Sequence, residues 1–377
     1  MVTIEQIQIK RDEFIRPSSL RAISLCAARP SMEAADWLER GEQEDSADAA
    51  MGTDLHDRAQ RVVEHWKRGM GWDEAHELVA EEPGAEKLSS FDDWCLRFAV
   101  SKVSDLIDQY GVWRENVLTE QDLPMQAMAM NRSGSADIVL VVPNELVIVA
   151  DYKFGYVDQG DPDTHDQTAA YAAAAAEMFK VNRVLVHLIQ PRADKEHRFP
   201  AGAMYDAAAL LAAAEWTRAV VAAAKVSNPQ LTAGYEQCLH CRAITCKAKR
   251  NWIMDLFEAL EFIGFPTDAD EAGELVGAYK VAEKTADDIK AEAKKRMLNG
   301  QEITGFKLGA AGETRSIDDQ HAALEKLLFS GVDPLELAKD GSLKLTLGKL
   351  SPASQEVIAD QVKEFPKSPS LLATKRK

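Results

Sequence analysis

The chain contains 377 residues, of which 46% are hydrophobic and 28% charged, and its formal net charge is −17 at pH 7. This composition is ordinary for a globular protein, the length exceeds that of a usual single domain, and no apolar run approaches the length that a membrane helix needs. The acidic balance, taken alone, argues against a nucleic-acid partner, because Lys and Arg must neutralise phosphates. A local basic face remains open, since residues 241–250 carry Arg242, Lys247, Lys249 and Arg250 and no acid.

The first part of the chain is predicted to be mostly helical. A loop with Ser18 and Ser19 as caps opens the first helix. A second helix begins near Gly52, in GTDLHDRAQRVVEHW, where apolar residues recur at helical spacing. A third runs through FDDWCLRFAVSKVSDLIDQYG and ends at Gly111.

From Val117 onward the hydrophobic period changes to that of β-strands. Three consecutive strands are predicted in VLTEQDL, SADIVLVV and LVIVADYK, separated by the turn compositions NRSGS and PNE. The alanine-rich segment 166–179 favours a helix, and 181–191 favours a fourth strand closed by proline. The expected fold class is therefore α/β, with a core of helix, three strands, helix and strand.

Helices are predicted to dominate the rest of the chain. Residues 203–227 form an alanine-rich helix, and 252–300 form a long helix whose mixed charges are typical of a solvated surface. We expect a core over residues 1–250, a long helical region over 251–300, and a small helical C-terminal appendage over 301–377. The last residues, SLLATKRK, are expected to be disordered.

Charged residues stand where two of the predicted strands end. Asp151 and Lys153 are two residues apart, so they share one face of their strand, and Asp137 lies in the neighbouring strand of the same hairpin. Two adjacent carboxylates remain charged at low cost only with a cation between them, and carboxylate oxygens suit Mg²⁺ or Mn²⁺. The alternative is a simple ion pair between Asp151 and Lys153 at a strand exit.

Three further polar residues are candidates for the same site. His56 can serve as a metal ligand, or it can be a histidine at the edge of the core. Gln167 and Tyr171 are four residues apart, on one face of the predicted helix that follows Asp151. They can hold a phosphate or a water, or they can form an ordinary pair on the helix surface.

Three cysteines show the spacing of a metal site. Cys238, Cys241 and Cys246 form C-x2-C-x4-C, which in a reducing compartment indicates metal rather than disulfides. The fourth ligand can be His240, Cys26 or Cys95, of which Cys26 has the small neighbours that suit a ligand, whereas Cys95 is expected to be a buried thiol. Zinc and an iron–sulfur cluster both accept four thiolates.

Taken together, GTDLH, GSAD, DYK, Q-x3-Y and the cysteine pattern resemble the iron–sulfur branch of the PD-(D/E)XK nucleases, the RecB-like exonuclease domains. The resemblance covers about residues 17–250. It is greatest to an uncharacterised phage-encoded group, with which it extends through EITGFKL near residue 302.

The resemblance implies a restriction-endonuclease-like core and a role for each matching residue. His56, Asp137 and Asp151 would bind the catalytic Mg²⁺ or Mn²⁺, and Lys153, Gln167 and Tyr171 would complete the catalytic set. The cysteines Cys26, Cys238, Cys241 and Cys246 would hold a 4Fe–4S cluster, with Zn²⁺ as the alternative.

The expected function is a metal-dependent DNA exonuclease of phage recombination or replication, with Arg242, Lys247, Lys249 and Arg250 as candidate DNA contacts. The alternatives are a non-cleaving protein that binds DNA ends and a zinc-stabilised interaction module. A single-strand annealing or recombination protein is an expected partner, and a membrane is not. The N-terminus lacks the pattern of a signal peptide, so we expect a cytoplasmic location, in the host cell if the protein is phage-encoded.

Overall fold

The computed structural model describes residues 2–41, 47–82, 87–143, 145–263, 265–304, 306–309, 312–317, 320–332, 345, 347, 350–367 and 370–373. The chain divides into two compact units. The first comprises Met1–Glu86 and Trp94–Asp288, and the second comprises Lys87–Asp93 and Ile289–Lys377. One boundary between the units falls inside the helix Ala269–Leu298, between Asp288 and Ile289.

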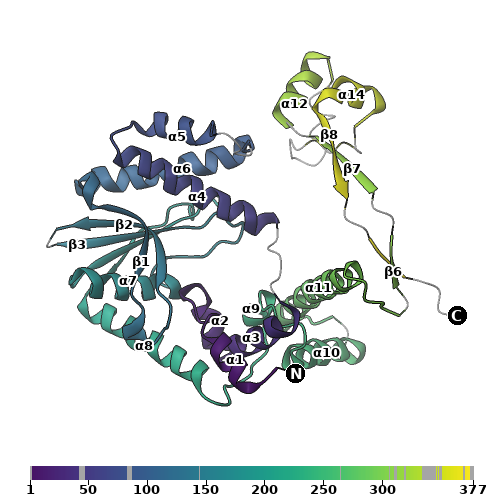
Figure 1. Ribbon diagram of the computed structural model, residues 1–377, viewed down its shortest axis with the longest axis horizontal. Coiled ribbons are helices and arrows are strands. Elements are labelled where there is room, and N and C mark those ends of the chain that lie inside the picture. Colours follow the sequence, from purple (N-terminus) through teal and green to yellow (C-terminus); the bar gives the residue numbers. More distant parts are fainter. Residues whose placement is uncertain are drawn as a thin grey trace. The chain divides into compact units, whose positions relative to one another are not determined.

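A mixed sheet of five strands forms the centre of the first unit (Figure 1). In spatial order the strands are β1 (Val117–Leu123), β2 (Gly134–Val142), β3 (Leu146–Tyr152), β4 (Val184–Ile189) and β5 (Ala203–Tyr205). β1, β2 and β3 pair antiparallel, β3 and β4 pair parallel, and β5 returns antiparallel to β4. The four predicted strands are confirmed, but 203–205, expected to be helical, form the short fifth strand.

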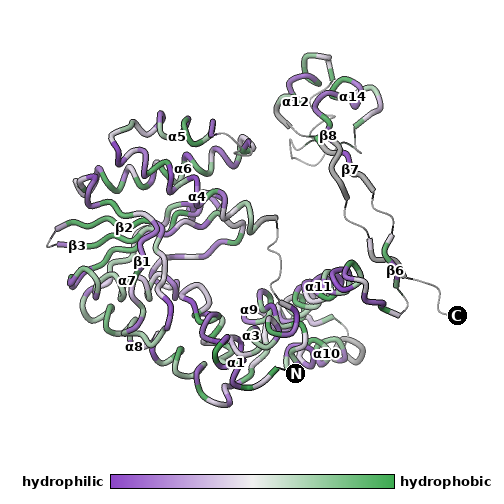
Figure 2. Tube along the Cα trace, viewed as in Figure 1, coloured by the Kyte–Doolittle hydropathy of each residue, from purple (hydrophilic) through white to green (hydrophobic). Residues whose placement is uncertain are grey.

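Helices cover both faces of this sheet. Figure 1 shows α4 (Ala47–Lys67), α5 (Trp72–Ala80) and α6 (Ser90–Tyr110) on one side, and α7 (Asp166–Phe179) and α8 (Ala207–Lys225) on the other. α7 is the crossover that a parallel pair such as β3 and β4 requires. Its alanines are buried in the core with the valines of β3 and β4, because small side chains let the helix approach the sheet closely. Figure 2 shows the apolar colouring along β2 and β3.

Contrary to the sequence-based expectation, α8 is long and apolar enough by composition to cross a membrane. Composition alone is weak evidence for a membrane span, because the core helix of a globular protein can be equally long and apolar. Leu210, Val220 and Val221 of α8 lie in the core with the alanines of α7. In this fold α8 is therefore a covering layer of the sheet.

The N-terminal helices pack beside segments that come more than 200 residues later. α1 (Ile4–Arg11), α2 (Leu20–Leu25) and α3 (Arg29–Arg40) lie near α9 (Tyr235–Leu239) and α10 (Lys247–Ile263), and α2 contacts α9. The backbone N–H of Ala28 donates to Gln230 O over 2.9 Å. The single helix predicted over 252–300 is in fact α10 and α11 (Ala269–Leu298), and Pro266 lies between them, where a helix cannot continue.

The second unit contains two antiparallel strand pairs as well as helices. β6 (Phe306–Leu308) pairs with β9 (Leu371–Ala373), and β7 (Gly312–Ile317) pairs with β8 (Val362–Lys367). α12 (Gln320–Phe329) and α14 (Pro352–Val357) accompany them, with Ala323, Leu327 and Ile358 in a small core. The prediction of a disordered tail is wrong for Leu371–Ala373, and residues 374–377 lie outside the described part of the chain. Short 3-10 turns complete the fold, at Pro17–Ser19, Arg114–Asn116, Gln126–Met128 and Ala359–Gln361.

Candidate metal centre and cysteine cluster

Asp137 and Asp151 lie side by side at the open end of the β2–β3 hairpin. Regular pairing ends at Ile138 opposite Ala150, so each aspartate is the next residue beyond the last pair. The backbone N–H of Tyr152 donates to Asp137 Oδ2 over 2.5 Å, so the carboxylate takes the place of the strand acceptor. Both residues are buried, with 9% and 2% of their surface exposed. The turn-and-strand pattern thus positions two carboxylates together, as predicted.

Gln167 joins Asp151 and Lys153 to Tyr171. The ammonium of Lys153 lies 2.6 Å from Asp151 Oδ2 and donates to Gln167 Oε1 over 2.9 Å. The amide nitrogen of Gln167 lies 3.2 Å from Asp151 Oδ1 and 3.0 Å from the hydroxyl oxygen of Tyr171. The ion pair between Asp151 and Lys153 therefore exists, but it belongs to a wider network that includes the first turns of α7.

Tyr171 also explains the glycine of GSAD. A Cβ on Gly134 would lie 2.6 Å from Cε1 of Tyr171, so the ring occupies the space that a side chain would take. Burial raises the pKa of the Tyr171 hydroxyl, which therefore stays protonated at neutral pH. Tyr171 is held in one place against the start of β2.

His56 reaches the aspartates from α4, on the opposite side of the sheet from α7. Its Nδ1 lies 3.2 Å from Asp137 Oδ1, and its ring packs edge-on against Phe154. Burial lowers the pKa of His56, but the hydrogen bond to Asp137 and the negative charges of Asp137 and Asp151 together outweigh burial, and the pKa is raised. Burial also raises the pKa of the Asp137 carboxyl, and the negative charge of Asp151 acts in the same direction. A bound cation would offset both the burial of these carboxylates and the repulsion between them.

Glu120 is a member of this site that the sequence analysis missed. It lies in β1, between Thr119 opposite Ile138 and Gln121 opposite Ala136, so strand register places it opposite Asp137. Its φ of 44° is left-handed and interrupts the pairing there. Ser135 Oγ lies 2.6 Å from Glu120 Oε2. Counting the hairpin register in the sequence would have found this residue.

His56, Glu120 and Asp137 can together offer ligands to one metal ion. One ligand atom from each lies within 4.8 Å of the other two, and no other His, Cys, Asp or Glu set among the described residues meets this criterion. Partial desolvation of the carboxyl raises the pKa of Glu120, and the negative charge of Asp137 adds to the effect. A donor set of two carboxylates and one imidazole suits a hard or borderline divalent cation such as Mg²⁺ or Mn²⁺.

The four candidate cysteine ligands are all buried and come from two regions of the chain. Cys26 ends α2, and its sulfur accepts a hydrogen bond of 3.5 Å from the backbone N–H of Thr232. The thiol of Cys238 interacts electrostatically with both Cys26 and Cys246, while Cys241 and Cys246 share one small apolar cluster. Burial raises the pKa of Cys241 to about 12. Cys95 lies on α6, fully buried, as expected of a structural thiol.

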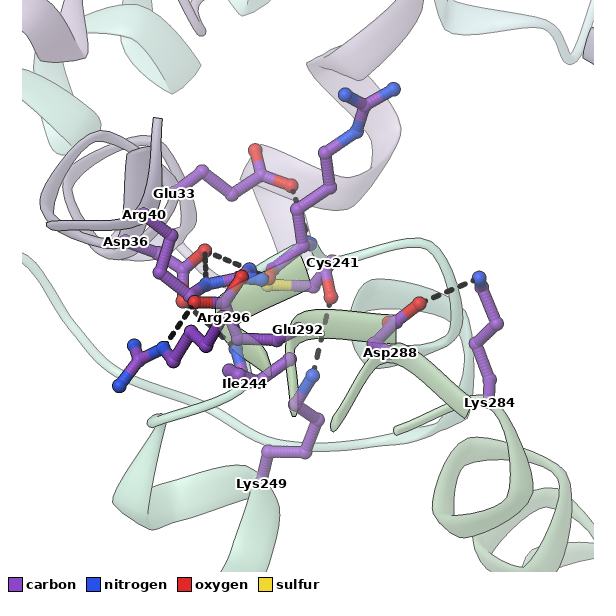
Figure 3. Close-up of polar contacts among 11 residues, drawn as sticks. Glu33, Asp36, Arg40, Cys241, Ile244, Lys249, Lys284, Asp288, Glu292 and Arg296 are labelled. Carbon is purple, nitrogen blue, oxygen red and sulfur yellow. Dashed lines mark hydrogen bonds and ion pairs between the residues drawn. The ribbon is translucent and has the colours of Figure 1, made fainter. Parts of the chain in front are cut away.

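One face of α3 holds the cysteine loop by its backbone (Figure 3). Glu33 Oε1 accepts from Arg242 N over 3.1 Å, and Asp36 Oδ1 accepts from Ile244 N over 3.2 Å.

Two arginines of the same helix bind backbone carbonyls of the loop. Arg29 donates to His240 O over 3.0 Å, and Arg40 donates to Arg242 O over 2.9 Å. Each guanidinium also pairs with a carboxylate of the same helix, Arg29 with Glu33 and Arg40 with Asp36. We call these four α3 side chains the α3 ladder; it positions the loop through protein contacts.

The candidate DNA contacts near the cysteines differ in exposure. Arg242, Lys247 and Arg250 are exposed. Lys249 is only 2% exposed, and its ammonium donates to Cys241 O over 3.2 Å. The prediction that Lys249 contacts DNA is therefore wrong, because a buried ammonium cannot reach a phosphate.

Comparison with known proteins gives a family and no activity. Residues 26–376 match a family described as "Protein of unknown function (DUF2800)". No curated protein and no solved structure matches the chain. Because the match spans nearly the whole chain, from the first candidate cysteine ligand to the C-terminal unit, the protein belongs to the DUF2800 family.

Proposed function

We propose that the protein is a metal-dependent deoxyribonuclease with a PD-(D/E)XK, restriction-endonuclease-like core, and that it hydrolyses phosphodiester bonds at DNA ends. One observation carries the proposal. The residues of four separated motifs form one polar cluster at the end of β3, and a further carboxylate joins it. The members of the cluster are His56, Glu120, Asp137, Asp151, Lys153, Gln167 and Tyr171.

The side chains divide into a ligand set and a phosphate-facing set. His56, Glu120, Asp137 and Asp151 would hold Mg²⁺ or Mn²⁺, which when bound supplies a Lewis acid for the scissile phosphate. Lys153 would neutralise negative charge that develops on that phosphate. Gln167 binds both Lys153 and Asp151, so it fixes the distance between the Lys153 ammonium and the Asp151 carboxylate. Preorganisation of this kind lowers the cost of reaching the transition state.

The cysteines support a second, structural metal group. We propose that Cys26, Cys238, Cys241 and Cys246 hold a 4Fe–4S cluster. The donor set is four buried thiols, and the thiol of Cys238 interacts electrostatically with those of Cys26 and Cys246. Zn²⁺ is the alternative, because four thiols also suit a closed tetrahedral zinc site.

The proposed activity implies a partner protein and a set of DNA contacts. Processing of DNA ends for phage recombination or replication would bring the protein to a single-strand annealing or recombination partner. Arg242, Lys247 and Arg250 are the exposed cations that would contact DNA phosphates near the cysteine loop.

Digestion of end-labelled linear DNA by anaerobically purified protein tests the proposal. With Mg²⁺ or Mn²⁺ we expect release of label, and with EDTA none. Asp151→Asn should abolish release, whereas Asp108→Asn, a matched change at an exposed residue of α6, should not. Closed circular DNA should resist if the enzyme requires an end. Absence of digestion on every DNA substrate would contradict the proposed activity and favour a protein that binds DNA ends without cleaving them.

A further inference from the structure

Lys249 is a buried cation beside the cysteine cluster. It lies on α10, three residues after Cys246, and its ammonium makes one hydrogen bond to a described residue, the backbone oxygen of Cys241. Its charge also acts on the thiols of Cys238 and Cys241. A buried ammonium is costly unless nearby negative charge offsets the loss of water. A neutral carbonyl supplies only part of that compensation.

Three carboxylates in the view of Figure 3, Glu33, Asp36 and Asp288, are paired with cations other than Lys249. Within the α3 ladder, Glu33 pairs with Arg29 and Asp36 pairs with Arg40, while both acids also accept from the backbone of the cysteine loop. Asp288 on α11 pairs with Lys284 over 2.8 Å. In the part of the chain that the structure describes, no carboxylate forms an ion pair with Lys249. The groups on which the charge of Lys249 acts are the thiols of Cys238 and Cys241.

We propose that Lys249 is the internal counter-ion of an anionic metal centre held by Cys26, Cys238, Cys241 and Cys246. This inference rests on the cysteine centre of the proposed function. Four thiolates outweigh the charge of a single Zn²⁺ or of a 4Fe–4S core, so either centre is a net anion. The α3 ladder is electrically balanced and fixes the loop, whereas Lys249 contributes the unbalanced positive charge. The two roles, positioning and charge compensation, are thus carried by different residues.

A matched pair of substitutions separates a specific counter-ion from general surface charge. Lys249→Met and Lys247→Met remove the same charge from the same turn of α10, but Lys247 is exposed. The readout is iron, acid-labile sulfide and zinc per chain during challenge with a chelator. We expect Lys249→Met to lose metal roughly 10 to 100 times more readily than wild type, the usual effect of removing an outer-shell partner. Lys247→Met should behave as wild type.

Redox measurement gives a second prediction if the centre is a cluster. Reduction adds negative charge, which a neighbouring ammonium stabilises. The midpoint potential of Lys249→Met should therefore be more negative than that of wild type, and that of Lys247→Met unchanged. Equal metal retention and equal potential in the two variants would overturn the inference.

Thermal unfolding distinguishes a counter-ion from a merely structural lysine. Lys249→Met should lower the melting temperature of the metal-loaded protein but not of the metal-stripped protein, because stripping removes the charge that Lys249 balances. Equal loss of stability in both forms would overturn the inference. If the methionine variant does not fold, Lys249→Arg keeps the charge and should retain the metal, and its failure to bind metal while folded would count against the proposal.

The readout is metal content rather than cleavage, so this test and the nuclease test can fail separately. Selective metal loss from Lys249→Met in a protein that never cleaves DNA would support Lys249 as counter-ion and contradict the proposed activity. Wild-type protein that holds no iron or zinc after anaerobic purification would overturn the counter-ion and the cysteine centre together, and would leave the nuclease site untouched.

Discussion

Asp137 accepts a hydrogen bond at 2.5 Å from the backbone N–H of Tyr152, at the point where β2 and β3 cease to pair. One carboxylate oxygen therefore completes the hairpin, and the other lies 3.2 Å from Nδ1 of His56. The same side chain serves the fold through Oδ2 and the candidate metal site through Oδ1. This double use links the stability of the hairpin to the geometry of the site.

Asp137→Asn should separate these two uses. Asparagine can still accept the hydrogen bond from Tyr152, so we expect the fold to persist, but loss of the charge should weaken divalent-metal binding by at least about 10-fold. Asp137→Ala should in addition destabilise the protein by about 1–3 kcal/mol, because it leaves a buried N–H without its acceptor. Calorimetric Mn²⁺ titration and thermal unfolding measure the two effects. Equal metal affinity in Asp137→Asn and wild type would remove Asp137 from the ligand set.

Glu120 should behave as a metal ligand although its residue is exposed. Glu120→Gln removes one of the three donors that lie within 4.8 Å of one another, so the Mn²⁺ affinity should fall by at least about 10-fold. Glu115→Gln, at an exposed glutamate in the turn before β1, is the matched control and should bind Mn²⁺ as wild type does. An identical affinity in the two variants would show that Glu120 only faces solvent near the site.

Gln167 should act on the rate of cleavage more than on DNA binding. Gln167→Met removes the link between Lys153, Asp151 and Tyr171 but changes no charge, so kcat should fall by about 10-fold or more while the affinity for DNA is kept. Tyr171→Phe removes only the hydroxyl that contacts Gln167, and should have a smaller effect. A fall in DNA affinity with unchanged kcat in Gln167→Met would instead place Gln167 on the substrate-binding surface.

His187 should make the protein sensitive to mild acid. Burial lowers its pKa from 6.5 to about 4, so the folded state keeps His187 neutral where the unfolded chain is protonated. Its contribution to stability is therefore complete above pH 6.5 and is lost as the pH falls toward 4, by at most about 3 kcal/mol. His187→Gln does not titrate, so the difference in unfolding free energy between wild type and variant should change with pH over this window. A difference that is constant from pH 7 to pH 4 would contradict the shift.

The strands and the acidic pair were predictable because the signals are local. Runs of β-branched residues between turn residues defined four strands. Because side chains alternate between the two faces of a strand, Asp151 and Lys153 were expected on one face. The short β5 could not be separated from the alanine-rich helix that follows it. Whether the closed fold brings His56 to Asp137 depends on how α4 packs, which no local pattern encodes.

Burial of charged residues was the main feature that the sequence could not supply. Lys249 stands among other cations in CRAITCKAKR, and composition alone assigns all of them to the surface. In the structure, the α10 helix turns Lys249 inward and leaves Lys247 and Arg250 exposed. Glu120 was missed for a different reason: its position opposite Asp137 follows from the register of β1 and β2, which the sequence analysis did not count.

The central claim is most directly tested by measuring Mn²⁺ binding and DNA cleavage on the same anaerobic sample. Electron paramagnetic resonance reports bound Mn²⁺, and release of 5′ or 3′ label from linear duplex reports cleavage. We expect both to rise over the same Mn²⁺ range in wild type and in Asp108→Asn, and both to be lost or strongly weakened in Asp151→Asn. Cleavage that persists in Asp151→Asn, or bound Mn²⁺ without cleavage of any DNA, would contradict the assignment of this cluster as a nuclease centre.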